Sequence, residues 1–121
     1  MTAFKKLEVW QDAISLVNSL RRISEDLIQS KEYELKNQLV RCAISIPSNI
    51  AEGASSGSDK NFIRYLNISL GSIAEFQTQL EISVHWNLLD PEEAKTIIQD
   101  AERLAYRLRK LKKYLARNTG V

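Results

Sequence analysis

The sequence has little cysteine, histidine, proline or glycine. Its 121 residues include one cysteine, one histidine, two prolines and four glycines. Because Cys42 is alone, an intrachain disulfide is excluded, and its apolar neighbours predict a small buried side chain rather than a nucleophile. The lone His85 provides little for general acid–base chemistry. The scarcity of proline and glycine leaves room for long, uninterrupted helices.

Long hydrophobic runs are also missing. No window approaches the roughly 20 apolar residues of a membrane-spanning helix, and the first residues contain no apolar stretch of signal-peptide length. Hydrophobic residues make up 44% and charged residues 26% of the chain, which is typical of a soluble globular protein. We therefore expect a cytoplasmic protein without a membrane partner. The length favours one domain spanning residues 1–121.

Helical periodicity is what the sequence does contain, and no strand pattern competes with it. Four segments carry it, at about residues 7–28, 33–53, 59–89 and 91–117. Ser58 or Asp59 is a good cap for the third helix, and Asp90 followed by Pro91 suits the start of the fourth. Short connections favour antiparallel neighbours, so we predict the all-α class and an antiparallel up-down four-helix bundle. In the first segment, the residues predicted to face the core are Trp10, Ala13, Ile14, Val17, Leu20, Ser24 and Leu27.

A proline lies inside the second predicted helix, in the segment Ser45-Ile46-Pro47-Ser48-Asn49-Ile50-Ala51-Glu52-Gly53. Such a proline removes one backbone hydrogen bond at a cost of about 3 kcal/mol. It therefore persists where neighbouring groups form hydrogen bonds with the freed backbone or where the fold requires a bend. We predict a structural network that fixes the bend and the helix register. The alternative is a small anion or nucleotide site built from Asn49 and the loop amides after Gly53, although the loop lacks the phosphate-loop pattern. The predicted network consists of Ser45, Pro47, Ser48, Asn49, Glu52, Gly53 and Glu75.

The chain resembles the 23S ribosomal RNA intervening-sequence protein family in this segment and in two others, Leu7-Glu8-Val9-Trp10-Gln11-Asp12-Ala13 and Gly71-Ser72-Ile73-Ala74-Glu75-Phe76-Gln77-Thr78-Gln79-Leu80. The resemblance follows the same order over most of the chain, but the fourth helix matches only as a long basic helix. It implies a four-helix bundle that assembles into a ring-like homopentamer, and it extends distantly to the accessory variability proteins of diversity-generating retroelements. Most members are of undetermined biochemical function, so the resemblance implies a fold rather than an activity.

Five apolar residues on the second and third helices lie away from the predicted core stripes. They are Val40, Ile44, Ile68, Ile82 and Trp86. One four-helix bundle cannot bury every face, so we predict that these residues form an interface between the subunits of a homo-oligomer. The resemblance favours a pentamer. The alternative is a set of scattered surface hydrophobes, which are common, or a wider core.

The fourth predicted helix has an apolar seam and, on nearly the opposite side, a basic face. The seam consists of Ile97, Ala101, Leu104, Leu108, Leu111 and Leu115. The basic face consists of Arg103, Tyr106, Lys110, Lys113, Tyr114 and Arg117. Residues 102–121 contain seven Lys or Arg and one acid, so this segment carries +6 and the remainder −4, although the net charge is only +2. The near-neutral total hides a polarised molecule.

Cations interleaved with tyrosines favour nucleic-acid binding, because cations displace the counterions of phosphates and aromatic rings stack on unpaired bases. The alternative is a solvated face that complements the helix macrodipole. We predict a non-enzymatic adaptor that binds RNA or DNA through the basic face. The alternative function is an oligomeric protein-interaction scaffold without direct nucleic-acid contact, such as the reverse-transcriptase accessory factor that the resemblance implies.

Catalysis and metal binding have little support in the sequence. One histidine cannot supply the two Glu-x-x-His pairs of a di-iron bundle, which leaves carboxylates such as Glu52, Glu75 and Glu81 without the required partners. We therefore predict no enzymatic activity, no catalytic residues, no metal and no cofactor.

Overall fold

Four α-helices and one short 3₁₀-helix make up the computed structural model, which describes residues 3–119 of the chain. The elements are η1 (Ala3–Lys6), α1 (Glu8–Gln29), α2 (Tyr33–Ala54), α3 (Asp59–His85) and α4 (Pro91–Thr119). The described residues contain no strand, which confirms the predicted all-α class. Residues 1–2 and 120–121, which belong to the predicted domain, lie outside the described residues.

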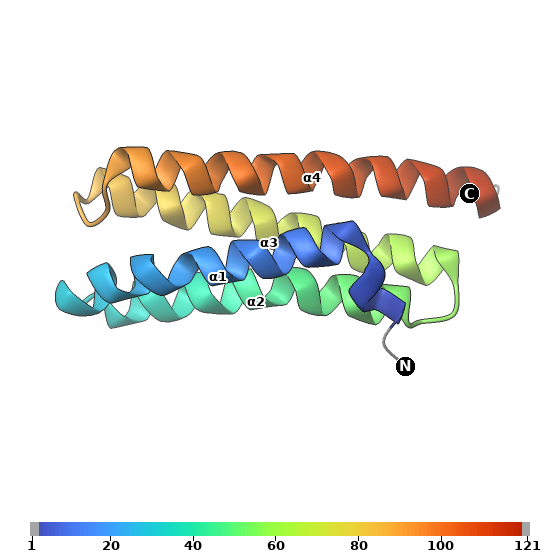
Figure 1. The fold of residues 1–121 in the computed structure, drawn as a ribbon, viewed down its shortest axis with the longest axis horizontal. Helices are drawn as coiled ribbons and strands as arrows, with labels where there is room; N and C mark the ends of the chain where they lie inside the picture. The colour runs from blue at the N-terminus through green and yellow to red at the C-terminus, as the bar shows by residue number, and fades with distance from the viewer. Residues whose placement is uncertain (1–2, 120–121) are drawn as a thin grey trace.

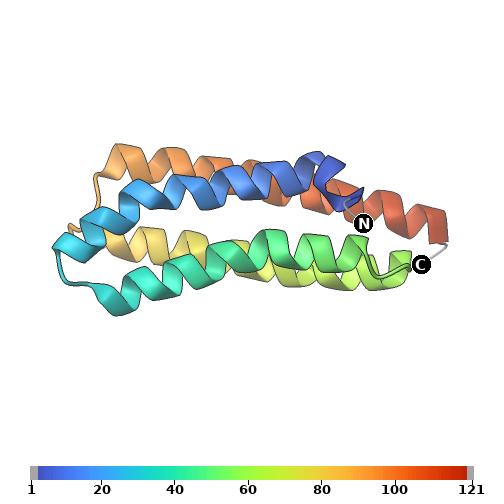
Figure 2. The ribbon, with the colours of Figure 1, turned by 60° about the horizontal axis from the view of Figure 1, so that its bottom comes forward.

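The helices lie side by side along the long axis of the molecule (Figure 1). The turns from α1 to α2 and from α3 to α4 lie at one end, whereas the turn from α2 to α3 lies at the other end with both chain termini. Each helix contacts two others, because α1 and α3 both pack against α2 and against α4. Figure 2 shows the resulting pairs, with α1 and α4 on one side and α2 and α3 on the other. Within residues 3–119, none of the helices combines the length and the apolar character that crossing a membrane requires.

The starts of α3 and α4 are fixed by the caps that the sequence predicts. Ser58 has extended backbone angles, and its side-chain oxygen accepts a hydrogen bond from the Asn61 amide at 3.2 Å. Before α4, the Asp90 carboxylate accepts from the Glu93 amide at 3.0 Å, and Pro91 occupies the first helical position. Each cap satisfies a backbone N–H group that has no partner inside its helix.

The end of α3 differs from the prediction, which extended this helix to residue 89. The helix ends at His85, because Asn87 adopts a left-handed conformation with φ of 58° and the Leu88 amide donates back to the Ser83 carbonyl at 2.9 Å. This is the hydrogen-bonded reversal that commonly ends a helix. Leu89 lies beyond the turn but is buried, so its apolar character extended the apparent periodicity past the true end. The other helix ends lie within two residues of the predicted ones.

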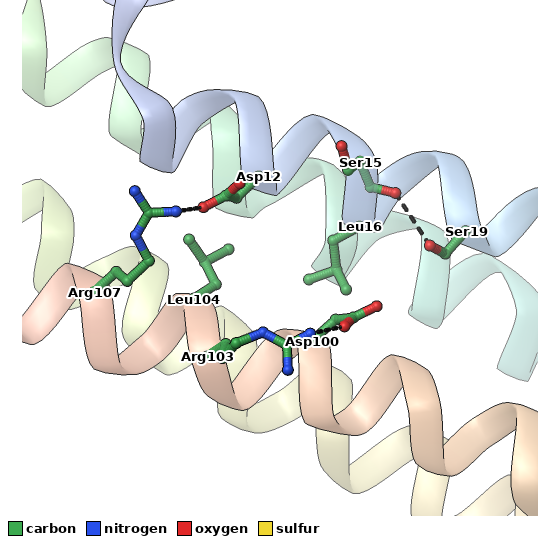
Figure 3. A pocket seen from close by; sticks show the side chains of 8 residues that line it. All are labelled: Asp12, Ser15, Leu16, Ser19, Asp100, Arg103, Leu104 and Arg107. Atoms are coloured by element: carbon green, nitrogen blue, oxygen red, sulfur yellow. Dashed lines mark hydrogen bonds and ion pairs between the residues drawn. The ribbon is translucent and has the colours of Figure 1, made fainter.

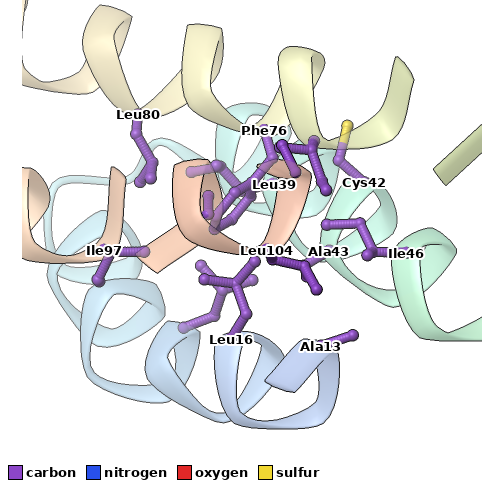
Figure 4. Packing of buried hydrophobic residues seen from close by; sticks show 14 of the residues in the cluster. Ala13, Leu16, Leu39, Cys42, Ala43, Ile46, Phe76, Leu80, Ile97 and Leu104 are labelled. Carbon is purple, nitrogen blue, oxygen red and sulfur yellow. The ribbon is translucent and has the colours of Figure 1, made fainter. Parts of the chain in front are cut away.

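All four helices contribute to one hydrophobic core, which Figure 4 shows around Phe76. Phe76 of α3 is completely buried, and Leu16 of α1, Leu39 of α2 and Leu104 of α4 belong to the same cluster. Truncating a buried aromatic side chain of this kind typically costs about 3–5 kcal/mol. The core therefore fixes the relative positions of the helices, including the face that α4 presents to solvent.

The predicted core stripe of α1 is only partly right. Trp10, Ile14 and Val17 are partly buried at the edge of the core, whereas Val9, Leu16 and Ile23 lie inside it. Helix α1 packs against both α2 and α4, so its innermost row faces the space between these two helices rather than α2 alone. The apolar residues at the edge face a hollow on the α1–α2 surface that is described below.

Candidate nucleic-acid interface

Helix α4 presents opposite sides to the core and to solvent. Ile97, Ala101, Leu104, Leu108 and Leu115 of the predicted seam are buried, and Leu111 is partly buried. Every residue of the basic face is exposed: Arg103, Tyr106, Lys110, Lys113, Tyr114 and Arg117. Packing of the seam is therefore what turns the cations and the two tyrosines outward.

Within residues 102–109 of α4, each arginine has a carboxylate partner. Arg103 forms an ion pair with Asp100, one turn earlier on α4. Arg109 approaches Glu102 at 3.9 Å. These pairs lie at the surface, where an ion pair is worth about 1 kcal/mol or less, so a phosphate can compete with the carboxylates.

Arg107 links α4 to α1. Its guanidinium donates to the Asp12 carboxylate and, at 3.1 Å, to the Glu8 carboxylate. The sequence prediction did not assign Arg107 a role. The sequence did contain one indication of this link, the spacing of Glu8 and Asp12. Two acids four residues apart on one helix face create a negative site that a cation on a neighbouring helix can occupy.

The cations within residues 110–117 of α4 differ from these arginines, because they have no carboxylate partner within residues 3–119. Among the described residues, no ion pair includes Lys110, Lys113 or Arg117. The Lys110 ammonium lies 5.6 Å from the centre of the Tyr106 ring, in a cation–π arrangement. In Figures 1 and 2, the last turns of α4 extend past the start of α1. Positive charge without an ion-pair partner among the described residues therefore gathers toward the end of α4.

A groove of about 290 Å³ separates α1 from the middle of α4. Figure 3 shows Arg107 reaching across it to Asp12, while Arg103 turns back to Asp100 on its own helix. The hydroxyl of Ser19 donates to the Ser15 carbonyl oxygen and adds to the polar wall on α1. Because both arginines and both carboxylates face the groove, it carries little net charge, in contrast to the end of α4.

The proline-containing segment lies against α3 rather than near the basic face. Pro47 is buried, and α2 continues through it to Ala54. The Ser45 and Ser72 hydroxyls are 2.8 Å apart, and the Asn49 amide donates to the Ser45 carbonyl oxygen at 2.8 Å. The Ser48 hydroxyl donates to the Ile44 carbonyl at 2.8 Å. Proline has no N–H group, so at position 47 it leaves the Ala43 carbonyl without its usual helical partner. The bonds from Ser48 and Asn49 add donors to the next two carbonyls, those of Ile44 and Ser45.

The remaining members of the predicted network have separate environments. A β-carbon built on Gly53 would lie 2.8 Å from the Tyr65 β-carbon, so only glycine allows α2 and α3 to approach this closely. Glu75 lies 3.8 Å from the Cys42 sulfur. Burial and then the Glu75 carboxylate raise the pKa of the Cys42 thiol, which disfavours the reactive thiolate. Glu52 is exposed.

The predicted interface residues lie on two neighbouring helices, α2 and α3, and differ in exposure. Ile44 of α2 and Ile68 and Trp86 of α3 are exposed by 49%, 46% and 59%, whereas Val40 and Ile82 are partly buried. Ile44 lines an apolar hollow of about 290 Å³ on the α1–α2 surface. Its other lining residues are Trp10, Ile14, Val17, Pro47, Ser48 and Ala51. Sequence periodicity missed this hollow because it placed the α1 residues in the core.

Within residues 3–119, no three His, Cys, Asp or Glu side chains gather in an arrangement that could hold a metal ion.

Comparison with known proteins gives one family and one fold. A family model described as "23S rRNA-intervening sequence protein" matches residues 5–110. A solved structure described as a protein with unknown function from the S23 ribosomal protein family, from Bacteroides thetaiotaomicron VPI-5482, superimposes with a TM-score of 0.82 and 24% sequence identity. The similarity covers 87% of this chain and 98% of the solved one. At this identity the structural likeness shows the fold alone. No curated protein matches the chain.

Proposed function

We infer that this chain, which belongs to the 23S rRNA-intervening sequence protein family, is a non-enzymatic adaptor that binds RNA or DNA through the basic face of α4. The observation that supports this most strongly is the end of α4. There Lys110, Lys113 and Arg117 are exposed without a carboxylate partner among the described residues, next to the exposed rings of Tyr106 and Tyr114.

Cations in this arrangement bind nucleic acid mainly through phosphates. Each contact releases counterions, so three contacts to a single strand give a log–log salt slope of about −2 per subunit. Phosphate contacts carry no base information, so we expect little sequence specificity. A face that only complemented the helix macrodipole would need one or two cations in the last turn, whereas here they extend over several turns. RNA is the first ligand to test, because both the family name and the name of the solved relative refer to ribosomes.

The test is a binding titration at increasing salt with fluorescent single-stranded RNA, structured RNA and DNA. We expect binding at about 50 mM salt and a steep loss of affinity as salt rises. The variant with Arg103, Lys110, Lys113 and Arg117 all changed to glutamate should abolish binding, with unchanged helical circular dichroism because these side chains lie away from the seam.

A matched control keeps the same change in net charge. Arg21, Arg41, Lys60 and Lys95 are exposed and lie outside the basic face, and they likewise comprise two arginines and two lysines. Changing these four to glutamate should weaken binding much less than the face variant does. Equal losses would mean that net charge rather than the basic face drives binding. Failure of the wild-type protein to bind any of the probes at about 50 mM salt would contradict the proposed function.

The second candidate is an oligomeric protein-interaction scaffold that remains in the cytoplasm. The observation that favours it is the apolar hollow beside Ile44, which a monomer leaves open to water. In this proposal an antiparallel up-down bundle uses Ile44 and the other predicted interface residues to form a ring-like homo-oligomer, with a pentamer favoured by the resemblance. Light scattering that returned a monomer mass at tens of micromolar protein would contradict the assembly.

A further inference from the structure

A second hollow, of about 410 Å³, lies where the start of α1 meets the basic face. Figures 1 and 2 both place the beginning of α1 beside α4. The lining residues come from the two ends of the described chain: Lys6, Leu7, Glu8, Val9, Tyr106, Arg107, Lys110 and Leu111. Its volume is within the range of about 300–1,000 Å³ that is usual for sites of small molecules.

The walls of the hollow combine three kinds of surface. Val9 is buried, and Leu7 and Leu111 are partly buried, so they provide an apolar floor. Tyr106 provides an aromatic ring that is 59% exposed. The Lys110 ammonium lies 5.6 Å from the centre of this ring, so a planar group stacked on the exposed ring would also lie near a cation.

The charges around the hollow are not equivalent. Arg107 is occupied by Asp12 and Glu8, and these bonds link α1 to α4 beside the hollow. Lys6 and Lys110 are exposed, and among the described residues neither forms an ion pair. An anion in the hollow would therefore find two ammonium groups that form no ion pair, next to an aromatic ring and an apolar floor, with Glu8 as the one carboxylate among the lining residues.

We propose that this hollow holds one unpaired nucleotide of the bound strand. The base stacks on the exposed ring of Tyr106 above the apolar floor, and the flanking phosphates meet Lys6 and Lys110. A base inside a duplex cannot bind in this way, because both of its faces are already covered by neighbouring bases. The proposal rests on the nucleic-acid-binding function and adds to it a preference for single strands, with Lys6 as a contact from outside α4.

The experiment compares a fluorescent single-stranded RNA of about ten nucleotides, within the usual site sizes of single-strand binders, with a duplex of the same length. Wild-type protein should bind the single strand more tightly. Tyr106→Ala should weaken single-strand binding roughly tenfold, because stacking on an aromatic side chain contributes that much per base, and should leave duplex binding nearly unchanged. Tyr106→Phe keeps the ring and should bind like the wild type.

Tyr33→Ala is the matched control for the ring. Tyr33, at the start of α2, is exposed by 55% and lies outside both the basic face and the hollow, so its removal should leave the preference for single strands unchanged. Equal helical circular dichroism and melting temperature for the tyrosine variants would show that the bundle is intact.

Salt separates the stacking contact from the phosphate contacts. Tyr106→Ala should lower single-strand affinity without changing the salt slope, because stacking releases no counterions. Lys6→Gln should reduce the slope by about 0.7, the value for one lost phosphate contact on a single strand. Lys95→Gln, which removes an exposed charge near the other end of α4, should leave the slope unchanged.

Two failures can be told apart. If the wild-type protein binds no nucleic acid, the proposed function and this inference are both wrong. If the protein binds single strands and duplexes equally, or if Tyr106→Ala and Tyr33→Ala behave alike, the hollow does not hold a base and the proposed function still stands.

Discussion

Polar side chains line both the contact of α2 with α3 and the contact of α1 with α4, but their chemistry differs. Between α2 and α3 the contacts are mainly those of hydroxyls, with Glu75 at the surface as the exception: the buried Ser69 hydroxyl donates to the Ile46 carbonyl at 3.0 Å, and Ser45 meets Ser72. Between α1 and α4 they are charged and lie around open hollows, as the pair of Arg107 and Asp12 does.

The difference separates stability from binding. Enclosed hydroxyls that find partners fix the register of two helices, because any shift would leave a buried polar group unsatisfied. Exposed ion pairs are individually weak, and their members can exchange one partner for another. The α2–α3 side of the molecule therefore holds the bundle together, whereas the α1–α4 side is suited to contact a charged ligand.

The largest effect on stability should come from Gly53→Ala, on the α2–α3 side of the molecule. We expect this change to lower the free energy of unfolding by about 2 kcal/mol, because the overpacking that alanine causes outweighs its better helix propensity. The added β-carbon would lie 2.8 Å from the Tyr65 β-carbon and 2.9 Å from the Phe62 ring. Chemical denaturation measures the change. Gly71→Ala is the control on α3: its new β-carbon meets no atom within 4 Å, so it should gain up to about 1 kcal/mol. Equal effects of the two changes would show that close approach at Gly53 is unimportant.

A smaller effect is expected from Ser69→Ala, which removes a buried hydrogen bond between α3 and α2. The loss should be about 1 kcal/mol and should not depend on salt, because no charge is involved. Ser83→Ala tests the reason, since Ser83 is equally buried but donates at 2.9 Å to the Gln79 carbonyl of its own helix. Its removal should change stability little, because such back-bonding does not hold helices together. A larger loss for Ser83→Ala would refute the role of the contact between helices.

The sequence predicted where the helices of both contacts begin better than it predicted which side of each helix faces the core. Local signals such as the Ser58 and Asp90 caps need only neighbouring residues, so the helix starts could be read directly. The rotation of α1 could not, because the row through Trp10 and the row through Val9 both satisfy helical spacing. Only packing against two helices at once selects the second row.

In the candidate site, too, local spacing predicted some features, whereas others depend on tertiary packing. Helical spacing alone placed the six residues of the basic face on one exposed side of α4. The ion pair of Arg107, which lies beside that face, could not be predicted in this way, because its partner Asp12 is 95 positions away in the sequence. The contribution of Lys6 to the second hollow is likewise a consequence of tertiary packing, because Lys6 ends η1 and meets residues of α4 around this hollow only in the folded bundle.

The smallest effect on stability should come from Arg107→Gln, which removes the link between α4 and α1. The Arg107 side chain is 38% exposed and its partners Asp12 and Glu8 are 42% and 79% exposed, so solvent screens both pairs. We expect a loss below about 1 kcal/mol at low salt, and a double-mutant cycle with Asp12→Asn should give a coupling energy in the same range. At about 1 M salt, where the screening length is roughly 3 Å, the coupling should nearly vanish. A coupling above about 2 kcal/mol that salt does not reduce would instead place Arg107 among the groups that hold the bundle together, as the buried hydroxyls do.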